Sequence, residues 1–331
     1  MILAGDIGGT NTRLALIDAV NEEMRIVFEK TFRSREMPGL EPTISEFLSL
    51  QSGDLGAASF GVAGPVLNGR CQTTNLPWVV DSKLLAKQLN MKNVGLINDL
   101  VANAYGITVM QNSDFVILNK GVRDATGNMA IISAGTGLGQ AVMHWDGKMH
   151  RPFASEGGHA DFAPRNSVEI ELLDYSMKVF GHVSYERLIS GPGLLHIYQF
   201  LRDTDKGEEP SWLAQKISRC DPAATISGLA MDGKSPLCSM ALDIMVSLYG
   251  AEAGNLALKA LATGGVYLGG GIAPRIVSKL KGPLFMNAFT AKGRMRPLLQ
   301  NMPVMVIMNP NAALLGAARH ALFEFVHCDV K

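Results

Sequence analysis

The stretch Leu3-Ala-Gly-Asp-Ile-Gly-Gly-Thr-Asn-Thr-Arg-Leu-Ala-Leu16 places two short apolar runs on either side of a glycine-rich turn. The pattern is typical of a strand, a tight turn and a second strand, and it returns at Ile131-Ile-Ser-Ala-Gly-Thr-Gly-Leu-Gly-Gln-Ala-Val142. Glycines let the backbone of such a turn approach a ligand closely, and its exposed N–H groups form a concave site for anionic oxygens. Two such turns therefore indicate a phosphate-bearing ligand, which we interpret as a nucleotide held between two lobes.

The bulk composition is typical of a globular enzyme. The chain has 331 residues, of which 47% are hydrophobic, so it can bury more than one core and favours two domains. Thirty basic and thirty acidic residues give zero formal net charge, so nothing in the charge balance indicates a nucleic-acid or membrane surface. The N-terminus reaches Asp6 before any long apolar core, and the most apolar long stretch, 237–262, is interrupted by charged residues. We therefore expect no secretory signal, and a core helix over 237–262 in place of a membrane span.

The cysteines lie far apart in the chain, at Cys71, Cys220, Cys238 and Cys328. Their spacing includes no Cys-x-x-Cys pair and no Cys/His cluster of the kind that binds a metal. We interpret them as ordinary thiols of a protein in a reducing, cytoplasmic compartment.

The first hundred residues alternate between strand and helix patterns. Strands are predicted at 3–5, 12–17, 25–32, 57–62 and 94–97, and helices at 41–51 and 81–89. Asp81 is the expected N-cap of the second helix. Strands followed by crossover helices predict an α/β domain with at least part of its sheet parallel.

The same pattern begins again after Gly106. Strands are predicted at 114–118, 129–134, 140–145, 265–268 and 304–308, with mainly helical structure from Ser167 and a last helix at 311–325 that packs on the first domain. Asp146-Gly147 predicts a type I′ hairpin turn. The recurrence of a glycine hairpin with α/β segments leaves two explanations open: a diverged internal duplication, which we favour modestly, or two hairpins that arose separately.

Asp6 follows a buried strand and precedes the first glycine turn. Its carboxylate could hold Mg²⁺ through water while the turn amides and the Thr10 hydroxyl meet phosphate oxygens. It could equally stabilise the hairpin turn, and the motif alone leaves both interpretations open. The second turn, Gly135-Thr-Gly-Leu-Gly139, has a spacing similar to that of the dinucleotide fingerprint, but that fingerprint needs a helix where 140–143 has a strand pattern.

Three further segments carry groups suited to a polyol. Asn98-Asp99 lies at a strand-to-helix junction, where Asp99 could be an N-cap or a general base that takes a hydroxyl proton. Glu156-Gly-Gly-His159 joins a carboxylate, which accepts hydroxyl protons, to an imidazole that can donate and accept. Glu186 could be a solvated helix charge, or the turn at 190–193 could fix it against the site.

Six separated motifs then occur in one order that closely resembles bacterial glucokinases of the hexokinase-like, actin-type ATPase superfamily, from residue 3 to about residue 316. They are Asp6-Ile-Gly-Gly-Thr-Asn-Thr-Arg13, Ile97-Asn-Asp99, Gly135-Thr-Gly-Leu-Gly139, Glu156-Gly-Gly-His-Ala-Asp-Phe-Ala-Pro164, Ile189-Ser-Gly-Pro-Gly193 and Gly264-Gly-Val-Tyr-Leu-Gly-Gly-Gly-Ile-Ala-Pro-Arg275. The resemblance implies an α/β protein with a two-domain actin-like ATPase (ribonuclease H-like) fold, mixed sheets flanked by helices, and a central cleft. The small domain would span 1–107, completed by the C-terminal helix 311–331, and the large domain 108–310.

The resemblance also implies roles for individual residues. Asp99 resembles the catalytic base that faces the sugar 6-hydroxyl. Asn98, Asp99, Glu156, His159 and Glu186 resemble the family's residues that hold the sugar hydroxyls. Three segments resemble the family's nucleotide-binding positions. They are the first phosphate loop with Asp6, Gly8, Gly9, Thr10, Asn11 and Thr12, the second phosphate loop with Gly135, Thr136 and Gly137, and the adenosine-binding turn with Gly269 and Gly270. Asp6 would hold Mg²⁺ through water, and Thr74-Asn75-Leu-Pro-Trp78 is similar to a sugar-side loop.

The expected activity is phosphorylation of glucose by ATP with Mg²⁺, in glycolysis, by a cytoplasmic homodimer that binds neither nucleic acid nor a membrane. The related repressor/kinase group has a cysteine-rich zinc motif after its Glu-Gly-Gly-His, but Asp161-Phe-Ala-Pro-Arg165 contains no cysteine, so we expect no zinc. Two alternatives stay open: a kinase for another hexose or amino sugar of the same fold, and a catalytically silent sugar-sensing protein.

Overall fold

The computed structural model describes residues 1–20, 23–51, 53–73, 76–122 and 124–325, and the chain divides into two compact units. The first comprises Met1–Asp114, His150–Ala154 and Asn309–Lys331, and the second comprises Phe115–Met149 and Ser155–Met308. The division falls after Asp114, compared with the position after residue 107 expected from the sequence. Residues 326–331 of the expected C-terminal helix, and Thr74–Asn75 of the expected sugar-side loop, lie outside the described residues.

The first unit is built on a five-stranded mixed sheet with the strand order β3-β2-β1-β4-β8. Its strands are β1 (Ile2–Ile7), β2 (Asn11–Val20), β3 (Glu23–Arg33), β4 (Ala57–Val62) and β8 (Gly95–Asn98). The β1, β2 and β3 strands pair antiparallel, whereas β4 lies parallel to β1 and β8 parallel to β4. The predicted α/β class with a partly parallel sheet is thus confirmed.

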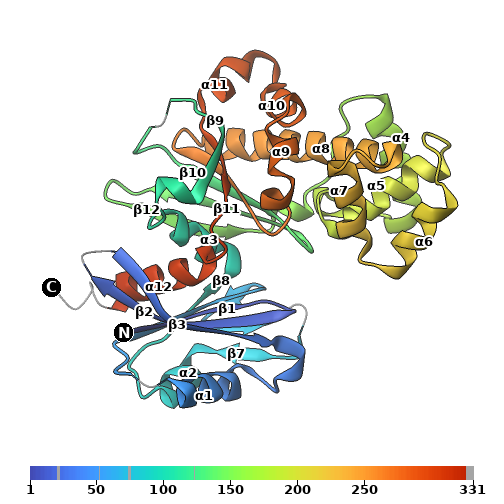
Figure 1. Cartoon of the computed structure of the whole chain (residues 1–331). Helices are drawn as coiled ribbons and strands as arrows, with labels where there is room; N and C mark the ends of the chain where they lie inside the picture. The colour runs from blue at the N-terminus through green and yellow to red at the C-terminus, as the bar shows by residue number, and fades with distance from the viewer. Residues whose placement is uncertain (21–22, 52, 74–75, 123, 326–331) are drawn as a thin grey trace. The chain divides into compact units, whose positions relative to one another are not determined.

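Helices cover both faces of this sheet (Figure 1). Alternate side chains of β1 point to opposite faces, so Leu3 and Ile7 pack with helices α1 (Leu40–Leu50) and α2 (Ser82–Gln88), and Ile2 and Ala4 pack with α12 (Ala312–Phe325). Asp81 caps α2 as predicted, since its carboxylate accepts a hydrogen bond from the Lys83 amide at 2.9 Å. Helix α3 (Asp99–Ile107) lies against α12, where a Cβ atom on Gly106 would overlap the Ala312 carbonyl.

A second, three-stranded sheet in this unit has no counterpart in the sequence-based prediction. Its strands are β5 (Val66–Leu67), β6 (Arg70–Gln72) and β7 (Val79–Asp81), all paired antiparallel. Strands of two or three residues are too short to show an alternating pattern in the sequence.

The six-stranded sheet has the order β12-β11-β10-β13-β14-β9. Its strands are β9 (Phe115–Asn119), β10 (Met129–Ala134), β11 (Leu138–Trp145), β12 (His150–Ser155), β13 (Gly265–Gly269) and β14 (Val304–Ile307). Like β1, β10 pairs antiparallel with the other strand of its hairpin and parallel with the strand on its other side. The order of the first five strands repeats that of the first sheet, which supports an internal duplication over two independent hairpins.

The turn after β11 differs from its prediction. A type I′ turn needs positive φ at both central residues, but of these only Gly147, with φ +94°, is among the described residues with positive φ. Asp146 is not, so the type I′ turn predicted at Asp146-Gly147 is wrong. The Asp146 carboxylate holds the turn by accepting hydrogen bonds from the Lys148 and Met149 amides, each at 2.9 Å.

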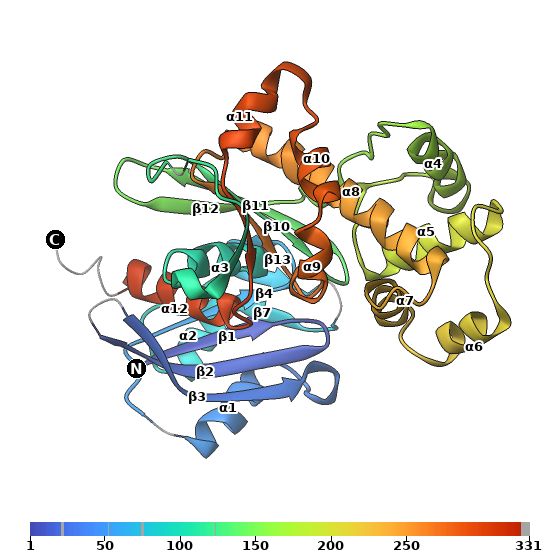
Figure 2. The same cartoon turned by 45° about the horizontal axis from the view of Figure 1, so that its top comes forward.

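Helix α8 (Pro236–Ala260) is the central helix of the second unit and confirms the core helix expected over 237–262. Helices α4 to α7 gather around one end of α8 (Figures 1 and 2). The other helices are α4 (Ser167–Phe180), α5 (Gly191–Asp203), α6 (Ser211–Arg219), α7 (Pro222–Met231), α9 (Val277–Leu280), α10 (Pro283–Thr290) and α11 (Arg296–Asn301). Short 3-10 segments are η1 (Ser34–Glu36), η2 (Asn112–Asp114), η3 (Gly157–His159), η4 (Tyr185–Arg187), η5 (Ala273–Ile276) and η6 (Gly293–Met295).

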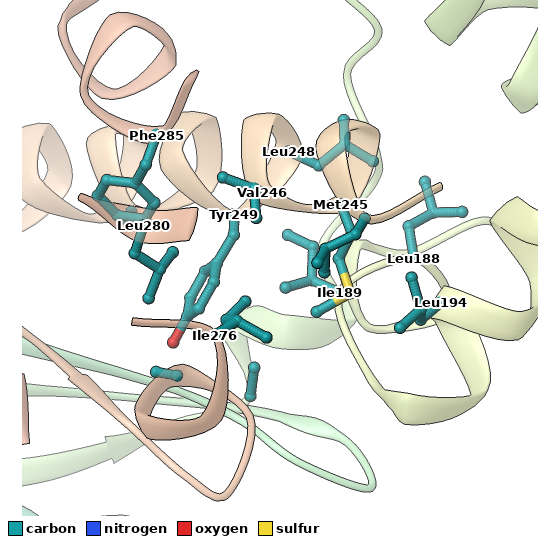
Figure 3. Packing of buried hydrophobic residues seen from close by; sticks show 14 of the residues in the cluster. Leu188, Ile189, Leu194, Met245, Val246, Leu248, Tyr249, Ile276, Leu280 and Phe285 are labelled. Atoms are coloured by element: carbon teal, nitrogen blue, oxygen red, sulfur yellow. The ribbon is translucent and has the colours of Figure 1, made fainter. Parts of the chain in front are cut away.

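The side chains of α8 pack on several sides at once. Figure 3 shows the Tyr249 ring beside Ile276, Leu280 and Phe285, and the Tyr249 hydroxyl donates a hydrogen bond to the Ile132 carbonyl of β10 at 3.1 Å. A helix buried all round is expected where it forms the centre of a core. In the described part of the chain, no helix is both long and apolar enough to span a bilayer.

Candidate active site

The first glycine turn joins β1 to β2 and is closed by backbone and hydroxyl groups. Gly8 donates its N–H to the Asn11 carbonyl at 2.9 Å, and the Ser34 hydroxyl donates to the Gly8 carbonyl at 2.7 Å. The buried Thr12 hydroxyl lies 2.9 Å from that of Ser34, so the Thr12 side chain supports the turn from behind. Thr10 and Asn11 are the exposed side chains of the turn. Those two, with the turn amides, can meet a phosphate.

Asp6 lies at the end of β1, opposite Arg13 of β2. Burial raises the pKa of the Asp6 carboxyl, and the positive charge of Arg13 opposes that shift. The Arg13 guanidinium also donates to Glu29, to the Pro310 carbonyl at 2.6 Å and to the Asn311 side chain. The hydrogen bonds that close the turn come from other groups, so the turn does not depend on the Asp6 carboxylate.

The junction between β8 and α3 holds Asn98 and Asp99. The N-cap is Asn98 and not Asp99, which corrects one of the two interpretations of Asp99: the Asn98 side-chain oxygen accepts from the Leu100 amide at 2.9 Å. The Asn98 amide group donates to the Gly64 carbonyl at 3.2 Å. Asp99 is the first residue of α3, half-buried, with one carboxylate oxygen 2.9 Å from the Leu100 amide. Because β1, β4 and β8 are parallel neighbours, the turn at Asp6 and this junction lie at the same edge of the sheet.

The second glycine turn runs directly into strand β11, which confirms that it is no dinucleotide fingerprint. Gly135 donates to the Gly137 carbonyl at 2.9 Å, and Gly191 donates to the Gly135 carbonyl at 2.8 Å. Thr136 is exposed at the tip. The turn is therefore tied to the start of α5 and leaves the Thr136 hydroxyl accessible.

Glu186 belongs to this cluster and is not a solvated helix charge. One of its carboxylate oxygens accepts from the Leu138 amide at 2.9 Å, and the other lies 3.8 Å from Nδ1 of His159. A Cβ atom on Gly137 would lie 2.5 Å from the Glu186 carboxylate. The structure thus brings together the second turn, the Glu-Gly-Gly-His segment and Glu186.

Residues Gly157–His159 form η3, with Glu156 at its N-cap, and the segment lies directly on β11. A Cβ atom on Gly158 would overlap the Leu138 carbonyl oxygen, so only glycine fits there. Glu156 and His159, at the two ends of the segment, are both exposed. Two side chains that can bond hydroxyl groups are therefore presented by a backbone that has no room to move inward.

The third glycine segment follows β13. Gly270 has φ +79°, and a Cβ atom there would overlap the Ala134 carbonyl oxygen, so glycine is required on both counts. Gly269 is the last residue of β13 and is buried. Gly271 is the glycine of this segment that lines a cavity.

That cavity has a volume of about 620 Å³. The glycine turn on one side of it could be predicted from the sequence, but the helical residues in its wall could not. Its lining comes from the second glycine turn, the start of α5, the first half of α7, one residue of α8 and the segment after β13: Gly135, Thr136, Gly191, Pro192, Leu194, Leu195, Asp221, Pro222, Ala223, Ala224, Ser227, Leu242, Gly271, Ile272, Arg275 and Ile276. A mostly apolar cavity of this volume suits a small organic ligand such as a nucleoside. The α5 and α7 residues show an ordinary helical pattern in sequence, and nothing in that pattern separates a cavity wall from a core.

The described residues contain no group of three or more His, Cys, Asp or Glu side chains that could hold a metal. Mg²⁺ in phosphate-binding sites commonly takes only one or two protein carboxylates and completes its shell with phosphate oxygens and water. The single carboxylate of Asp6, beside a turn that can meet phosphates, fits that kind of site.

Comparisons with known proteins agree on one family. A model of the Glucokinase family matches residues 3–323. A glucokinase of Nostoc sp. is 42% identical over 334 residues, covering 96% of this chain and 98% of that protein. The crystal structure of a glucokinase from an Antarctic psychrotroph is 32% identical with a TM-score of 0.86, covering 98% of this chain and 99% of that one.

A ROK family glucokinase from Streptomyces griseus, solved in complex with glucose and AMPPNP, is similar in fold at 19% identity and a TM-score of 0.66, covering 97% of this chain and 98% of that one. The likenesses to solved structures confirm the actin-like ATPase fold that the sequence resemblance implied.

Proposed function

This chain belongs to the glucokinase family, and from that premise we propose that it transfers the terminal phosphoryl group of ATP to the 6-hydroxyl of glucose, giving glucose 6-phosphate and ADP. The observation that carries the proposal is the double contact of Glu186. Its carboxylate bonds to the backbone of a phosphate-type glycine turn and lies beside His159 of the polyol-binding segment. In the second unit, groups that suit a nucleotide phosphate therefore lie next to groups that suit a sugar hydroxyl.

Asp99 is the proposed general base. Its carboxylate would accept the proton of the sugar 6-hydroxyl as that oxygen attacks the terminal phosphorus. Since Asn98 caps α3, Asp99 is not needed for that purpose, and its position at a strand-to-helix junction suits a ligand-facing role. The Asn98 oxygen accepts from the Leu100 and Val101 amides and its amide group donates to the Gly64 carbonyl, which leaves one amide hydrogen that can donate to a sugar hydroxyl.

The proposed sugar ligands are Asn98, Glu156, His159 and Glu186. Carboxylates accept from hydroxyl groups, and a neutral imidazole donates from one nitrogen and accepts at the other, so the set can bond a ring of hydroxyls in both directions. A site that bonds each hydroxyl rejects analogues that lack one. A panel of deoxy and amino hexoses would therefore separate a glucose kinase from a kinase for another sugar.

The nucleotide would place its adenosine in the cavity lined by α5, α7 and the Gly271 segment, with phosphates at the two glycine turns. The proposed phosphate contacts are the turn amides and Thr10, Asn11 and Thr136. Phosphoryl transfer asks the protein mainly for positioning and charge stabilisation, which amide donors supply without reorganisation. A bound Mg²⁺, held through water by Asp6, would neutralise phosphate charge.

We also propose that the protein works as a cytoplasmic homodimer. This assembly is an expectation of the family, and free thiols at Cys71, Cys220 and Cys238 suit a reducing compartment. Light scattering on the purified protein would give a mass near twice 35.5 kDa. A monomer at micromolar concentration would contradict the dimer.

A coupled assay of ADP release in the presence of glucose, ATP and Mg²⁺ tests the function. We expect turnover with glucose and a much lower rate without it. Glucose binding by calorimetry with no ADP release would instead identify a sugar-sensing protein.

A further inference from the structure

A carboxylate without solvent exposure lies in the middle of α8, in the second unit. Glu252 is 0% exposed, and its two oxygens accept hydrogen bonds from the Gln140 side chain at 2.8 Å and the Asn255 side chain at 2.9 Å. Burying a carboxylate is costly even when it is hydrogen-bonded, and an apolar residue of similar volume would commonly serve the core at least as well. Its presence at this position therefore calls for a role beyond packing.

The first partner, Gln140, supports the Glu-Gly-Gly-His segment. Gln140 lies on β11 and is 2% exposed. A Cβ atom on Gly157 would overlap Oε1 of Gln140, so the backbone of η3 rests directly on this amide group. Because Glu252 accepts from the amide nitrogen of Gln140, it fixes which end of the amide faces Gly157.

The second partner, Asn255, leads to Glu186. The Asn255 side-chain nitrogen also donates to the Tyr185 hydroxyl at 3.1 Å, and Tyr185 directly precedes Glu186 in η4. Lys292 holds Asn255 in this orientation by donating to its side-chain oxygen and to the Ala251 carbonyl at 2.9 Å. The two oxygens of one carboxylate thus connect to the two segments that carry Glu156, His159 and Glu186.

We propose that Glu252 is a positioning residue for the sugar side of the active site. It touches no substrate; it holds Gln140 under Gly157 and, through Asn255, Tyr185 beside Glu186. The inference rests on the proposed function, because the segments it positions are the proposed sugar-binding ones.

The substitution Glu252→Gln tests this with little change in shape. A glutamine has one acceptor end and one donor end, so its NH₂ group must face either the Gln140 or the Asn255 donor, and one of the two links breaks. We expect the KM for glucose to rise about tenfold or more, the KM for ATP to stay within about twofold, and kcat to fall less than the glucose affinity.

A reciprocal exchange supplies the rescue. In the double variant Gln140→Glu with Glu252→Gln, the new glutamine donates to position 140 and accepts from Asn255, while an oxygen still faces Gly157. This variant should recover most of the glucose affinity. The matched control is Tyr249→Phe, which removes another buried hydrogen bond from the same helix but has no link to η3 or η4. Its KM for glucose should stay at the wild-type value.

Tyr185→Phe provides a second variant if Glu252→Gln fails to fold, since it cuts the Asn255 branch to Glu186 and leaves the Glu252–Gln140 bond in place, although it also removes a hydrogen bond with the Ala163 backbone. It should raise the KM for glucose and leave that for ATP. The proposal is overturned if the folded variants keep the wild-type KM for glucose, if both KM values rise together, or if Tyr249→Phe has the same effect.

Amide hydrogen exchange tests the positioning role of Glu252 independently of the proposed glucose kinase activity. The His159 amide bonds to the Glu156 carbonyl at 3.0 Å and the Tyr185 amide to the Ala160 carbonyl at 3.1 Å, and both protons should exchange faster in Glu252→Gln. That readout needs no activity, so it holds even if the wild-type protein shows no glucose kinase activity. Unchanged exchange in 156–160 and 184–188 would contradict the positioning role whatever the enzyme's activity.

Discussion

The Glu186 carboxylate accepts a hydrogen bond from the Leu138 amide at 2.9 Å while its other oxygen lies 3.8 Å from the His159 ring. A single side chain therefore meets both the second phosphate-type turn and a proposed sugar ligand. Removing it should disturb the binding of both substrates, because the Leu138 amide loses its partner and the His159 ring loses its neighbouring charge.

Glu186→Ala should raise the KM for glucose and the KM for ATP, each by about five- to a hundredfold, the range set by leaving a partly buried donor unpaired. Steady-state kinetics with each substrate varied in turn measures both values. Asp174→Ala is the matched control, because Asp174 is an exposed carboxylate whose ion pair among the described residues is with Lys178 on the surface of α4. A Glu186→Ala enzyme with normal KM for ATP would show that the Leu138 contact has no part in nucleotide binding.

The variants Asp99→Ala and Asn98→Ala should differ in their effects on kcat and on the free energy of unfolding. Asp99→Ala should reduce kcat by roughly 10²- to 10⁴-fold if the carboxylate is a general base. Asn98→Ala leaves that base in place but should weaken glucose binding, since Asn98 is a proposed sugar ligand, and should lower the free energy of unfolding by about 1 kcal/mol, because it removes the N-cap of α3. Kinetics and urea unfolding on both variants make the comparison, and near-normal turnover in Asp99→Ala would rule out the base.

The substitution Gly158→Ala tests the close packing of η3 on β11, and Gly228→Ala provides the comparison. Gly158→Ala should destabilise the protein by about 1–3 kcal/mol and weaken glucose binding, because the added Cβ overlaps the Leu138 carbonyl. Gly228 lies in α7, where nothing is within 4 Å of an added Cβ. Gly228→Ala should therefore stabilise the protein by about 0.4–1 kcal/mol. Equal unfolding free energies for the two variants would contradict the packing argument.

The longer strands and helices, and the places of the motifs on them, could be predicted from the sequence. Strands such as Ala57–Val62 and Met129–Ala134 are continuous apolar runs bounded by turn residues, and the structure reproduces both ranges. The largely buried α8 could be recognised as a core helix because Asp243, Glu252 and Lys259 make its apolar stretch too polar to span a membrane. In these cases local pattern and burial agree.

The remaining features depend on contacts that no local pattern records. Asn98 and Asp99 are both good N-cap residues, and only the observed backbone decides between them. Glu252 is one charge in an apolar helix, and its partner Gln140 lies 112 positions away in the chain. The walls of the cavity come from helices whose sequence resembles any core helix.

Acidification should destabilise the first unit through His320. This ring lies against the Ser59 hydroxyl, with Nδ1 2.9 Å from Oγ, and burial lowers the pKa of His320 from 6.5 to about 4. The folded protein resists protonation that the unfolded chain accepts, so stability is complete above pH 6.5 and is lost as the pH falls from about 6.5 towards 4. The loss would reach at most about 3 kcal/mol, at about 1.4 kcal/mol per pH unit, and less to the extent that solvent reaches the ring.

Urea unfolding at pH 7, 6 and 5 measures this slope, and His320→Gln is the control, because glutamine can bond Ser59 but does not titrate in this range. The pKa of His196 is also lowered by burial, so a smaller slope should remain in that variant. Equal slopes in the wild-type protein and His320→Gln would show that His320 does not carry the pH dependence.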